Sequence, residues 1–411
     1  MTTGQLIFAC LAGVIPLVYM LYRAGARKSQ SGEARPHSQP AYYGWYTVIG
    51  MTLPAIGVAL VASILHLTGL YSVPASMLIT AVLALGAAGA WMALRAIHPA
   101  LRARNYVEST IHWLLIAASL VSILTTLGIV LSVLFEAMQF FKMVGFWNFI
   151  TGTEWEPDTA FLAGAGRGVE GVAEAKFGSL PIFAGTFMIT AIAMLVAIPI
   201  GLFSAIYMSE YASRRLRGWL KPALEVLAGI PTVVYGFFAA ITVSPLVVRA
   251  AESMGLHAEY TNALTPGLVM GVMIIPFISS LSDDVINAVP QAMRDGSLAL
   301  GTTNAETIRY VVLPAALPGI VAASLLAISR AVGETMIVVM AAGLRPNLTW
   351  NPLEGMTTVT VRIVDALTGD QAFDSPLTLS AFGLGLVLLL LTLMLNLISI
   401  SVIRRFREKY E

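Results

Sequence analysis

One apolar stretch, residues 318–342, contains two charged side chains and limits what the rest of the chain can fold into. It reads PGIVAASLLAISRAVGETMIVVMAA, which is long enough for a bilayer-spanning helix, because a span needs about 20 mostly apolar residues. A rise of about 1.5 Å per residue places Arg330 roughly 18 Å from Pro318, near the bilayer midplane. A lone charge at that depth costs about 3 kcal/mol on insertion scales. The fold must therefore accommodate this charge.

Two interpretations of the charged pair remain open. Arg330 and Glu334 are four residues apart, so in a continuous helix they share one face and can form an ion pair. One interpretation is a structural ion pair that holds helices together. The other is a polar station on a solute pathway, with Thr335 beside it, since ionisable groups inside membranes are usually functional.

The composition indicates an all-α, polytopic membrane protein. Hydrophobic residues make up 57% of the chain and charged residues 11%, and the mean hydropathy is +0.80. The net charge of +1 gives no indication of nucleic-acid binding. The histidines are scattered and the single cysteine, Cys10, lies in the first apolar run, so we expect no metal site, no cofactor and no intrachain disulfide. Gly166, Gly168 and Gly171 match a dinucleotide-binding pattern, which we discount because no strand precedes them.

Nine apolar segments predict about nine transmembrane helices. They cover residues 6–21, 45–67, 73–94, 111–135, 183–209, 226–248, 266–282, 318–342 and 382–402. With nine spans, the basic clusters at 23–35, 95–104, 214–221 and 404–407 all fall on one side, which the positive-inside rule makes cytoplasmic. The C-terminus and the loop 289–315, here called the coupling loop, are then cytoplasmic. The N-terminus and the polar segments 142–180 and 345–379 are extracytoplasmic, in a bacterial cytoplasmic (inner) membrane.

Proline and glycine interrupt two of these segments. Pro199 and Gly201 fall in the fifth, and Gly229-Ile230-Pro231 falls in the sixth. Non-helical backbone at membrane depth is tolerated only where it is buried in protein or lines a cavity. Gly229, Pro231 and Tyr235 are therefore candidates for lining a pathway, although simple helix packing explains them equally well.

The coupling loop contains a specific spacing. It reads DGS at 295–297, then three residues, Gly301, nine residues and VVLP at 311–314. This resembles the loop of bacterial ABC-importer permeases, written E-A-A, three residues, G, nine residues, I-x-L-P. Gly301 would end one short helix, and a second would begin near Ala305, which gives a unit that can dock in a cleft of another protein.

The resemblance makes Asp295, Gly301, Leu313 and Pro314 the expected ATPase contacts. Asp295 would keep a negative charge at a helix N-terminus, where it suits the dipole, whereas Gly296 would weaken that helix. The chain contains no G-x-x-x-x-G-K-[ST] motif, so ATP hydrolysis is expected on a separate subunit and not in this chain.

Further motifs narrow the resemblance to the phosphate-specific permeases. They are FGSLP at 177–181, GIPTVVYG at 229–236, LSDD at 281–284, AVP at 288–290 and RAVGETM at 330–336. GETM, together with TGTEW at 151–155, resembles the PstC type more than the PstA type. The resemblance covers residues 109–411, so we predict a six-span permease core there and a three-span extension in residues 1–108.

The resemblance implies the membrane permease subunit of an ATP-driven importer that translocates inorganic phosphate across the cytoplasmic membrane. Its implied partners are an ATP-binding cassette ATPase dimer, a second permease of the PstA type and an extracytoplasmic phosphate-binding protein, within membrane lipid. Three alternatives remain. They are a permease for another small oxyanion or solute, a proton-coupled secondary transporter using Glu334, Asp283 and Asp284, and a membrane sensor with a closed pathway. The coupling loop argues against the secondary transporter, because an ion-coupled carrier needs no ATPase contact.

Overall fold

The computed structural model describes residues 3–30, 36–69, 74–157, 176–368 and 375–407, and helices dominate these ranges. Their one strand pair joins β1 (Trp155–Glu156) to β2 (Lys176–Phe177) in antiparallel register. The chain divides into two compact units, Met1–Gly128 and Ile129–Glu411. The predicted all-α membrane fold is confirmed, while the glycine pattern at 166–171 lies outside the described residues.

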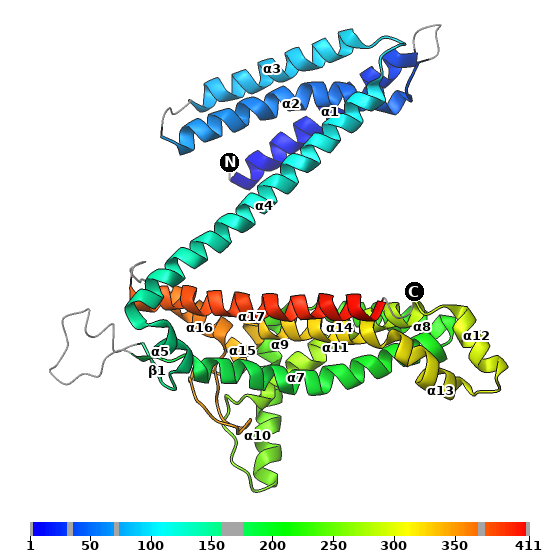
Figure 1. The fold of residues 1–411 in the computed structure, drawn as a ribbon. Coiled ribbons are helices and arrows are strands. Elements are labelled where there is room, and N and C mark those ends of the chain that lie inside the picture. Colours follow the sequence, from blue (N-terminus) through cyan, green and yellow to red (C-terminus); the bar gives the residue numbers. More distant parts are fainter. Residues whose placement is uncertain (1–2, 31–35, 70–73, 158–175, 369–374, 408–411) are drawn as a thin grey trace, which may run out of the picture. The chain divides into compact units, whose positions relative to one another are not determined.

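The first unit contains α1 (Thr3–Gln30), α2 (Pro40–Leu67), α3 (Ala75–Ala96) and the beginning of α4 (Ala103–Val144). Helix α2 packs against both α1 and α3 (Figure 1). A Cβ atom at Gly89 of α3 would lie 2.0 Å from the carbonyl oxygen of Gly50 of α2, so only glycine permits this approach. Small residues at such contacts are typical of membrane helix pairs.

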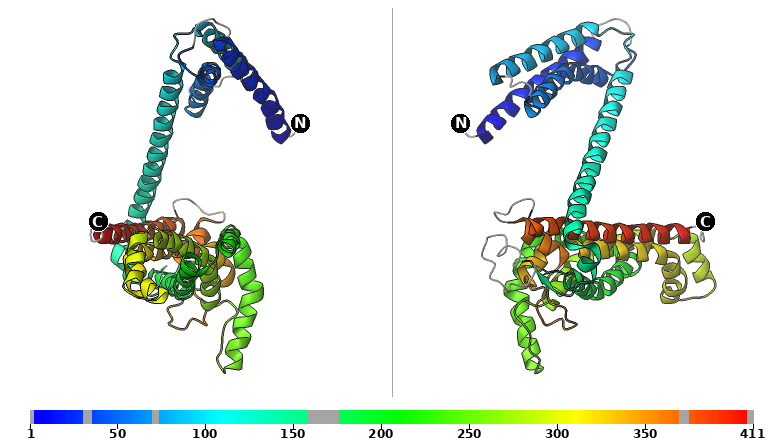
Figure 2. Two further views of the ribbon diagram at one scale, coloured as in Figure 1. Left: turned by 90° about the vertical axis from the view of Figure 1, so that its right-hand side faces the viewer. Right: turned by 60° about the vertical axis from the view of Figure 1, so that its left-hand side comes forward.

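Four long helices form the core of the second unit: α7 (Leu180–Ile206), α11 (Leu264–Asn287), α14 (Leu313–Val332) and α17 (Pro376–Arg407). Helix α11 packs against α7 and α14, and α14 also packs against α17 (Figures 1 and 2). Met270, Ile274 and Ile278 of α11 are fully buried. A helix that is apolar all round belongs in such a central position.

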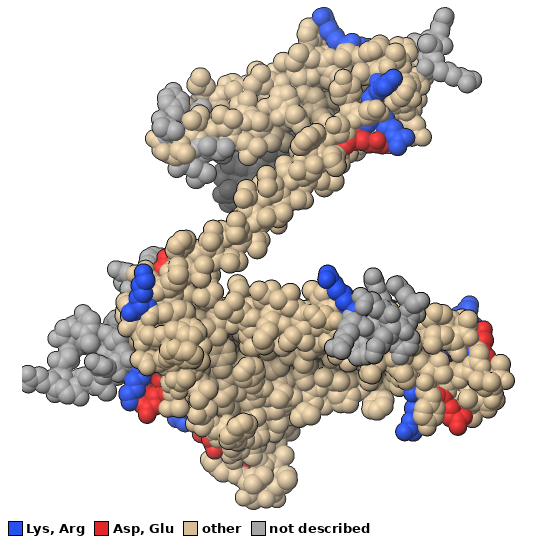
Figure 3. Space-filling model, in the orientation of Figure 1, with Lys and Arg blue, Asp and Glu red and all other residues tan. Residues whose placement is uncertain are grey.

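Shorter elements complete the second unit. They are α5 (Phe146–Thr151), η1 (Tyr207–Tyr211), α8 (Arg214–Ala228), α9 (Thr232–Phe238), η2 (Ala239–Val243), α10 (Ser244–Ser253), α12 (Gln291–Ala299), α13 (Asn304–Thr307), η3 (Ile308–Val312), α15 (Met336–Ala341) and α16 (Val359–Leu367). α9, η2 and α10 follow one another as a rod that runs crosswise to α7, α14 and α17 in both figures. On the face shown in Figure 3, the charged side chains of this unit gather toward its two ends and leave an uncharged band between them. Such a band suits the hydrocarbon core of a bilayer.

Eight helical segments within the described residues are long and apolar enough to cross a membrane. They are Pro40–Ala62, Met77–Ala96, Ala103–Val144, Leu180–Tyr211, Thr232–Ser253, Leu264–Asn287, Asn304–Val332 and Pro376–Val402. The remaining predicted span, residues 6–21, lies in α1, where the side chains of residues 3–15 are outside the description. These segments agree with the predicted spans except for their bounds.

The two predicted helix breaks have different outcomes. The break at Pro199 and Gly201 is wrong, because α7 continues through both residues. Gly201 instead allows close packing, since a Cβ there would lie 2.9 Å from the Ile278 side chain of α11. The break at Gly229-Ile230-Pro231 is confirmed, since α8 ends just before it and α9 begins just after it.

Candidate functional site

The apolar stretch 318–342 is not one helix. Helix α14 ends at Val332, Gly333 follows as its C-cap, and α15 begins at Met336. The prediction that Arg330 and Glu334 lie on one continuous helix face is therefore wrong. Their side chains also form no ion pair with each other among the described residues.

The Glu334 carboxylate explains why the helix restarts here. Its Oε1 accepts the backbone N–H groups of Thr335 and Met336, each at 3.1 Å, and lies 3.5 Å from that of Ile337. A negative charge is favourable at a helix N-terminus, where these N–H groups have no partner within the helix. The Glu334 carbonyl accepts a hydrogen bond of 2.8 Å from Thr360, so Glu334 also ties α15 to the segment that begins α16.

Arg330 borders a cavity of about 260 Å³, here called the Arg330 cavity. Its other lining residues are Met208, Lys221, Leu224, Glu225, Ala228, Met273, Pro276, Phe277 and Ser280. The guanidinium carbon lies 6.0 Å from the centre of the Phe277 ring, at the outer limit of a cation–π contact. Within the described part of the chain, the guanidinium has neither a hydrogen-bond acceptor nor a carboxylate partner, so its donors are available to an anion.

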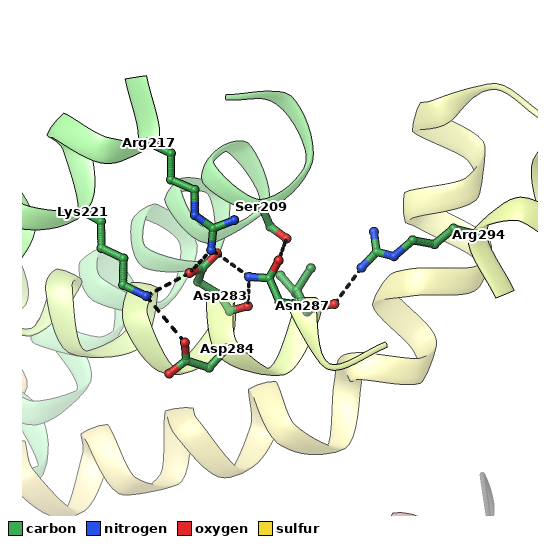
Figure 4. A network of polar contacts seen from close by, with 8 residues as sticks. Ser209, Arg217, Lys221, Asp283, Asp284, Asn287 and Arg294 are labelled. Atoms are coloured by element: carbon green, nitrogen blue, oxygen red, sulfur yellow. Dashed lines mark hydrogen bonds and ion pairs between the residues drawn. The ribbon is translucent and has the colours of Figure 1, made fainter. Parts of the chain in front are cut away.

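A buried carboxylate lies near this cavity, at the end of α11 that leads into the coupling loop. Asp283 is 0% exposed, and Arg217 of α8 donates from Nη2 to its Oδ2 at 2.8 Å and to its Oδ1 at 3.1 Å (Figure 4). Lys221, one turn further along α8, lies 3.3 Å from Asp283 Oδ2 and 3.6 Å from Asp284 Oδ1. Asn287 donates to Asp283 Oδ1 at 2.9 Å. We call these five residues the Asp283 cluster.

The sequence interpretation used the basic cluster 214–221 only to orient the chain and missed this pairing. Two signals could have found it. Arg217 and Lys221 share one face of a strongly amphipathic helix, and the pair of aspartates ends an otherwise apolar helix. A buried carboxylate requires such partners, because an unpaired charge inside protein is strongly destabilising.

Polar contacts continue from the Asp283 cluster into the coupling loop. Ser209 donates to Asn287 Oδ1 at 3.2 Å. Arg294 of α12 forms an ion pair with Glu210. It also donates to the carbonyl of Ile286 at 2.7 Å (Figure 4). The coupling loop is therefore fixed directly to the ends of α11 and η1.

The coupling loop has the predicted helix–turn–helix form. Gly301 has φ of +86° and follows the end of α12, while α13 begins at Asn304, one residue before the predicted start. Thr303 and Glu306 form a capping box at that start. Leu300, at the tip of the loop, is 88% exposed.

One residue of the coupling loop, Asp295, lies elsewhere in its helix than expected. Asp295 is the fifth residue of α12, where it accepts a hydrogen bond of 3.1 Å from Gln291, so its expected place at the helix N-terminus is wrong. The helix begins earlier, because Pro290 is its N-cap residue and Gln291 its first helical residue. Leu313 and Pro314 form the first turn of α14, where Leu313 is half-buried and Pro314 is exposed.

The three candidates from the sixth predicted span cluster at the turn between α8 and α9. Gly229 and Pro231 are exposed, whereas Tyr235 is buried and donates from its hydroxyl to the Leu227 carbonyl at 2.8 Å. That bond satisfies a carbonyl at the C-terminal end of α8, which lacks a helical partner. A pathway-lining role for these residues stays a prediction.

A polar pair joins the TGTEW segment at 151–155 to the second strand. Glu154 binds Lys176 beside the strand pair, and this hydrogen bond raises the Lys176 pKa above its usual value. Gly152 and Gly178 pack back to back, since a Cβ at Gly178 would lie 2.3 Å from the Gly152 backbone. Within the described ranges, no group of three or more His, Cys, Asp or Glu residues is arranged to hold a metal ion.

Comparison with protein families identifies the class. Residues 197–410, slightly over half of the chain, match the family described as "Binding-protein-dependent transport system inner membrane component". The chain belongs to this family, and it is a multi-pass inner-membrane protein. Residues 6–73 match a second family, described as "Phosphate ATP-binding cassette transporter".

Individual relatives confirm the predicted resemblance to phosphate-specific permeases. The "Phosphate transport system permease protein PstC 1" of Mycobacterium tuberculosis is 32% identical, with 67% of this chain and 87% of that protein covered. The "Probable ABC transporter permease protein YqgH" of Bacillus subtilis is also 32% identical, over 66% of this chain and 82% of its own length. Among solved structures, a bacterial ABC transporter involved in the import of alginate has a TM-score of 0.49 at 15% identity, with 74% of this chain and 99% of that chain covered.

Proposed function

We propose that this chain is the PstC-type permease subunit of an ATP-driven importer of inorganic phosphate. The observation that carries the proposal is the unpaired, exposed Arg330 guanidinium beside the Arg330 cavity of the membrane-spanning unit. The names of the PstC relatives and of the family matched by residues 6–73 support phosphate as the solute.

Arginine suits this solute for a chemical reason. Phosphate carries at least one negative charge and must exchange its water for fixed donors when it enters the membrane. The guanidinium offers a planar fork of donors that matches phosphate oxygens and keeps its charge at every relevant pH. Glu334 caps α15 and does not pair with Arg330. The Glu334 carboxylate therefore does not compete with the anion for the guanidinium.

The remaining parts of the importer are proposed as partner chains. An ATPase dimer would bind the coupling loop at Leu300, Asp295, Gly301, Leu313 and Pro314, because this chain has no phosphate-binding loop for ATP. A PstA-type permease would complete the pathway, and an extracytoplasmic phosphate-binding protein would deliver the solute. The positive-inside rule then gives a cytoplasmic C-terminus and an extracytoplasmic N-terminus.

The alternatives fit the geometry less well. A proton-coupled carrier would need a carboxylate without fixed partners, yet Asp283 contacts two cations and Glu334 accepts backbone N–H groups. Family membership also disfavours such a carrier. A permease for another oxyanion is the strongest remaining alternative, since an arginine fork also accepts sulfate-like anions.

The test uses the complete complex in liposomes with ATP inside and radiolabelled phosphate outside. We expect ATP-dependent uptake that excess sulfate does not inhibit, and we expect Arg330→Gln to abolish it while complex yield stays normal. Arg249→Gln is the matched control, because Arg249 is an exposed arginine on α10 outside the cavity lining. Uptake of sulfate in place of phosphate, or full phosphate uptake by Arg330→Gln, would contradict the proposal.

A further inference from the structure

We propose that Lys221 is a second anion-holding residue, which receives phosphate from Arg330 on its way toward the coupling-loop end of the permease. This inference rests on the proposed function and deepens it. Lys221 and Arg330 both border the Arg330 cavity, although they come from α8 and α14. An anion that leaves Arg330 within this cavity therefore meets one further cation.

The charge and donors of the cavity suit a passing anion. Two cations, Arg330 and Lys221, border it together with one carboxylate, Glu225. Outside the lining, Asp283 and Asp284 lie beside the Lys221 ammonium. Ser280 adds a hydroxyl, while Met273 and Phe277 supply apolar walls. The Lys221 side chain is 34% exposed, and donors that are partly withdrawn from water hold an anion more strongly than the same groups in water. Glu225 and the two aspartates beside Lys221 keep this attraction moderate, which passage requires.

Lys221 is held loosely enough to change partners. Its Nζ lies 3.3 Å from Asp283 and 3.6 Å from Asp284, and its side chain is 34% exposed. Arg217 holds the same Asp283 carboxylate through contacts of 2.8 and 3.1 Å. The lysine ammonium is a compact charge on a flexible four-carbon stem, so it can turn toward a new acceptor without movement of its helix.

The departure of Lys221 leaves no unpaired buried charge. Asp283 keeps both contacts to Arg217 and the hydrogen bond from Asn287. Removing one member of a buried ion pair is normally costly because the other charge loses its partner. In the Asp283 cluster, one cation fixes α8 to α11 while the second is released to the anion. Within the cluster, Arg217 thus has a structural role, whereas Lys221 takes part in transport.

The decisive experiment changes the charge at position 221 by chemical modification. Cys10, the single native cysteine, is first replaced by serine, and Lys221→Cys is introduced into the complete reconstituted complex. We expect phosphate uptake to fall roughly tenfold or more, as for a lost charge-assisted hydrogen bond. Modification with a positively charged aminoethyl thiosulfonate should restore uptake. A sulfonatoethyl reagent, which adds a negative charge, should not.

A second experiment tests whether phosphate occupies the space beside residue 221, by asking whether it protects the Lys221→Cys thiol from modification. Inorganic phosphate during turnover should slow modification of the Lys221→Cys thiol severalfold, since the anion would occupy the same space. Arg215→Cys is the matched control, because Arg215 is an exposed cation on α8 outside the cavity lining, and its modification should be insensitive to phosphate.

The outcomes separate this inference from the proposed function. Normal uptake by Lys221→Cys, or equal recovery with both reagents, would overturn the role of Lys221 while phosphate import stands. If the Lys221→Cys complex fails to assemble and the positively charged reagent does not reverse this, Lys221 has only a structural role and the inference is wrong. Absence of phosphate uptake by the unmodified parent complex would instead reject the proposed function.

Discussion

Asp283 shows how a membrane protein keeps a carboxylate out of water. Its side chain is 0% exposed, and three side chains from two helices donate to it. Arg217 and Lys221 belong to α8 and lie 66 and 62 residues before Asp283. Asn287 lies one turn after Asp283 on α11. The carboxylate is thus the point at which α8 is joined to α11.

Arg217 and Lys221 therefore differ in their expected mutational effects. Arg217→Gln leaves Asp283 with a weaker set of donors and should lower the stability of the complex by about 1–3 kcal/mol, the cost of an unsatisfied buried polar group. Lys221→Gln should leave stability nearly unchanged. Thermal unfolding of the purified complex in detergent measures both. Equal destabilisation by the two substitutions would contradict the separation of their roles.

Glu334 should behave as a helix cap. Glu334→Gln keeps an acceptor oxygen but loses the negative charge at the start of α15, so we expect a loss of about 0.5–1 kcal/mol. Glu334→Ala removes the acceptor as well and should cost about 1–2 kcal/mol. Thermal unfolding of both variants gives the comparison.

The same measurement on a double variant checks whether Glu334 and Arg330 interact. Because the two side chains are not paired, the effects of Glu334→Gln and Arg330→Gln should add within about 0.5 kcal/mol. Mutual rescue in the double variant would instead indicate a structural ion pair.

Among the elements, the coupling loop depends on a single backbone conformation. Gly301 adopts φ of +86° at the end of α12, which side chains other than glycine rarely tolerate. No atom lies within 4 Å of a Cβ built at Gly301, so its requirement comes from the backbone angle and not from crowding. Inside the same loop, Gly296 also has open space around it but has no positive φ.

These two glycines provide a matched pair of substitutions. Gly301→Val should distort the turn and uncouple ATP hydrolysis from uptake, because a β-branched residue at positive φ is strongly disfavoured. Gly296→Ala should preserve coupling and stabilise α12 by up to about 1 kcal/mol. Phosphate-stimulated ATPase activity and uptake are measured together in liposomes. Normal values of both in Gly301→Val would show that the turn does not transmit the coupling.

The elements also show where sequence reasoning succeeds. The turn at Gly301 was predictable because glycine spacing reports a local backbone requirement. The break at 333–335 was not predicted, because the long apolar runs on both sides of Gly333-Glu334-Thr335 favoured one continuous helix, and the contact of the Glu334 side chain with the first N–H groups of α15 appears only in the structure. The Asp283 cluster was missed as well, because the amphipathic face of α8 and the aspartates of α11 do not by themselves show that Arg217 and Lys221 meet Asp283 across more than 60 residues.

At the scale of the whole molecule, the chain divides at Gly128, within α4, whereas the motifs predicted a domain boundary at 108. All residues of the Asp283 cluster, the Arg330 cavity and the coupling loop lie in the second unit. The predicted division of roles between the residues 1–108 extension and the 109–411 core remains open to experiment.

Deletion of residues 1–104 tests this division. We expect the truncated chain to assemble and to keep phosphate uptake near the full-length rate, because it retains every residue of the proposed pathway. Complex yield and liposome uptake are compared with those of the full-length chain. A truncated chain that assembles in normal amounts yet fails to transport would give the extension a direct part in transport.

Leu300 has a consequence for the fate of the free subunit. A leucine that is 88% exposed on a polar loop leaves an apolar tip in water until another protein covers it. In the proposed complex, covering this one side chain with the ATPase would contribute about 1.5–3 kcal/mol to association. The tip of the coupling loop would then also distinguish a free subunit from an assembled one, because only the free subunit would leave Leu300 in water.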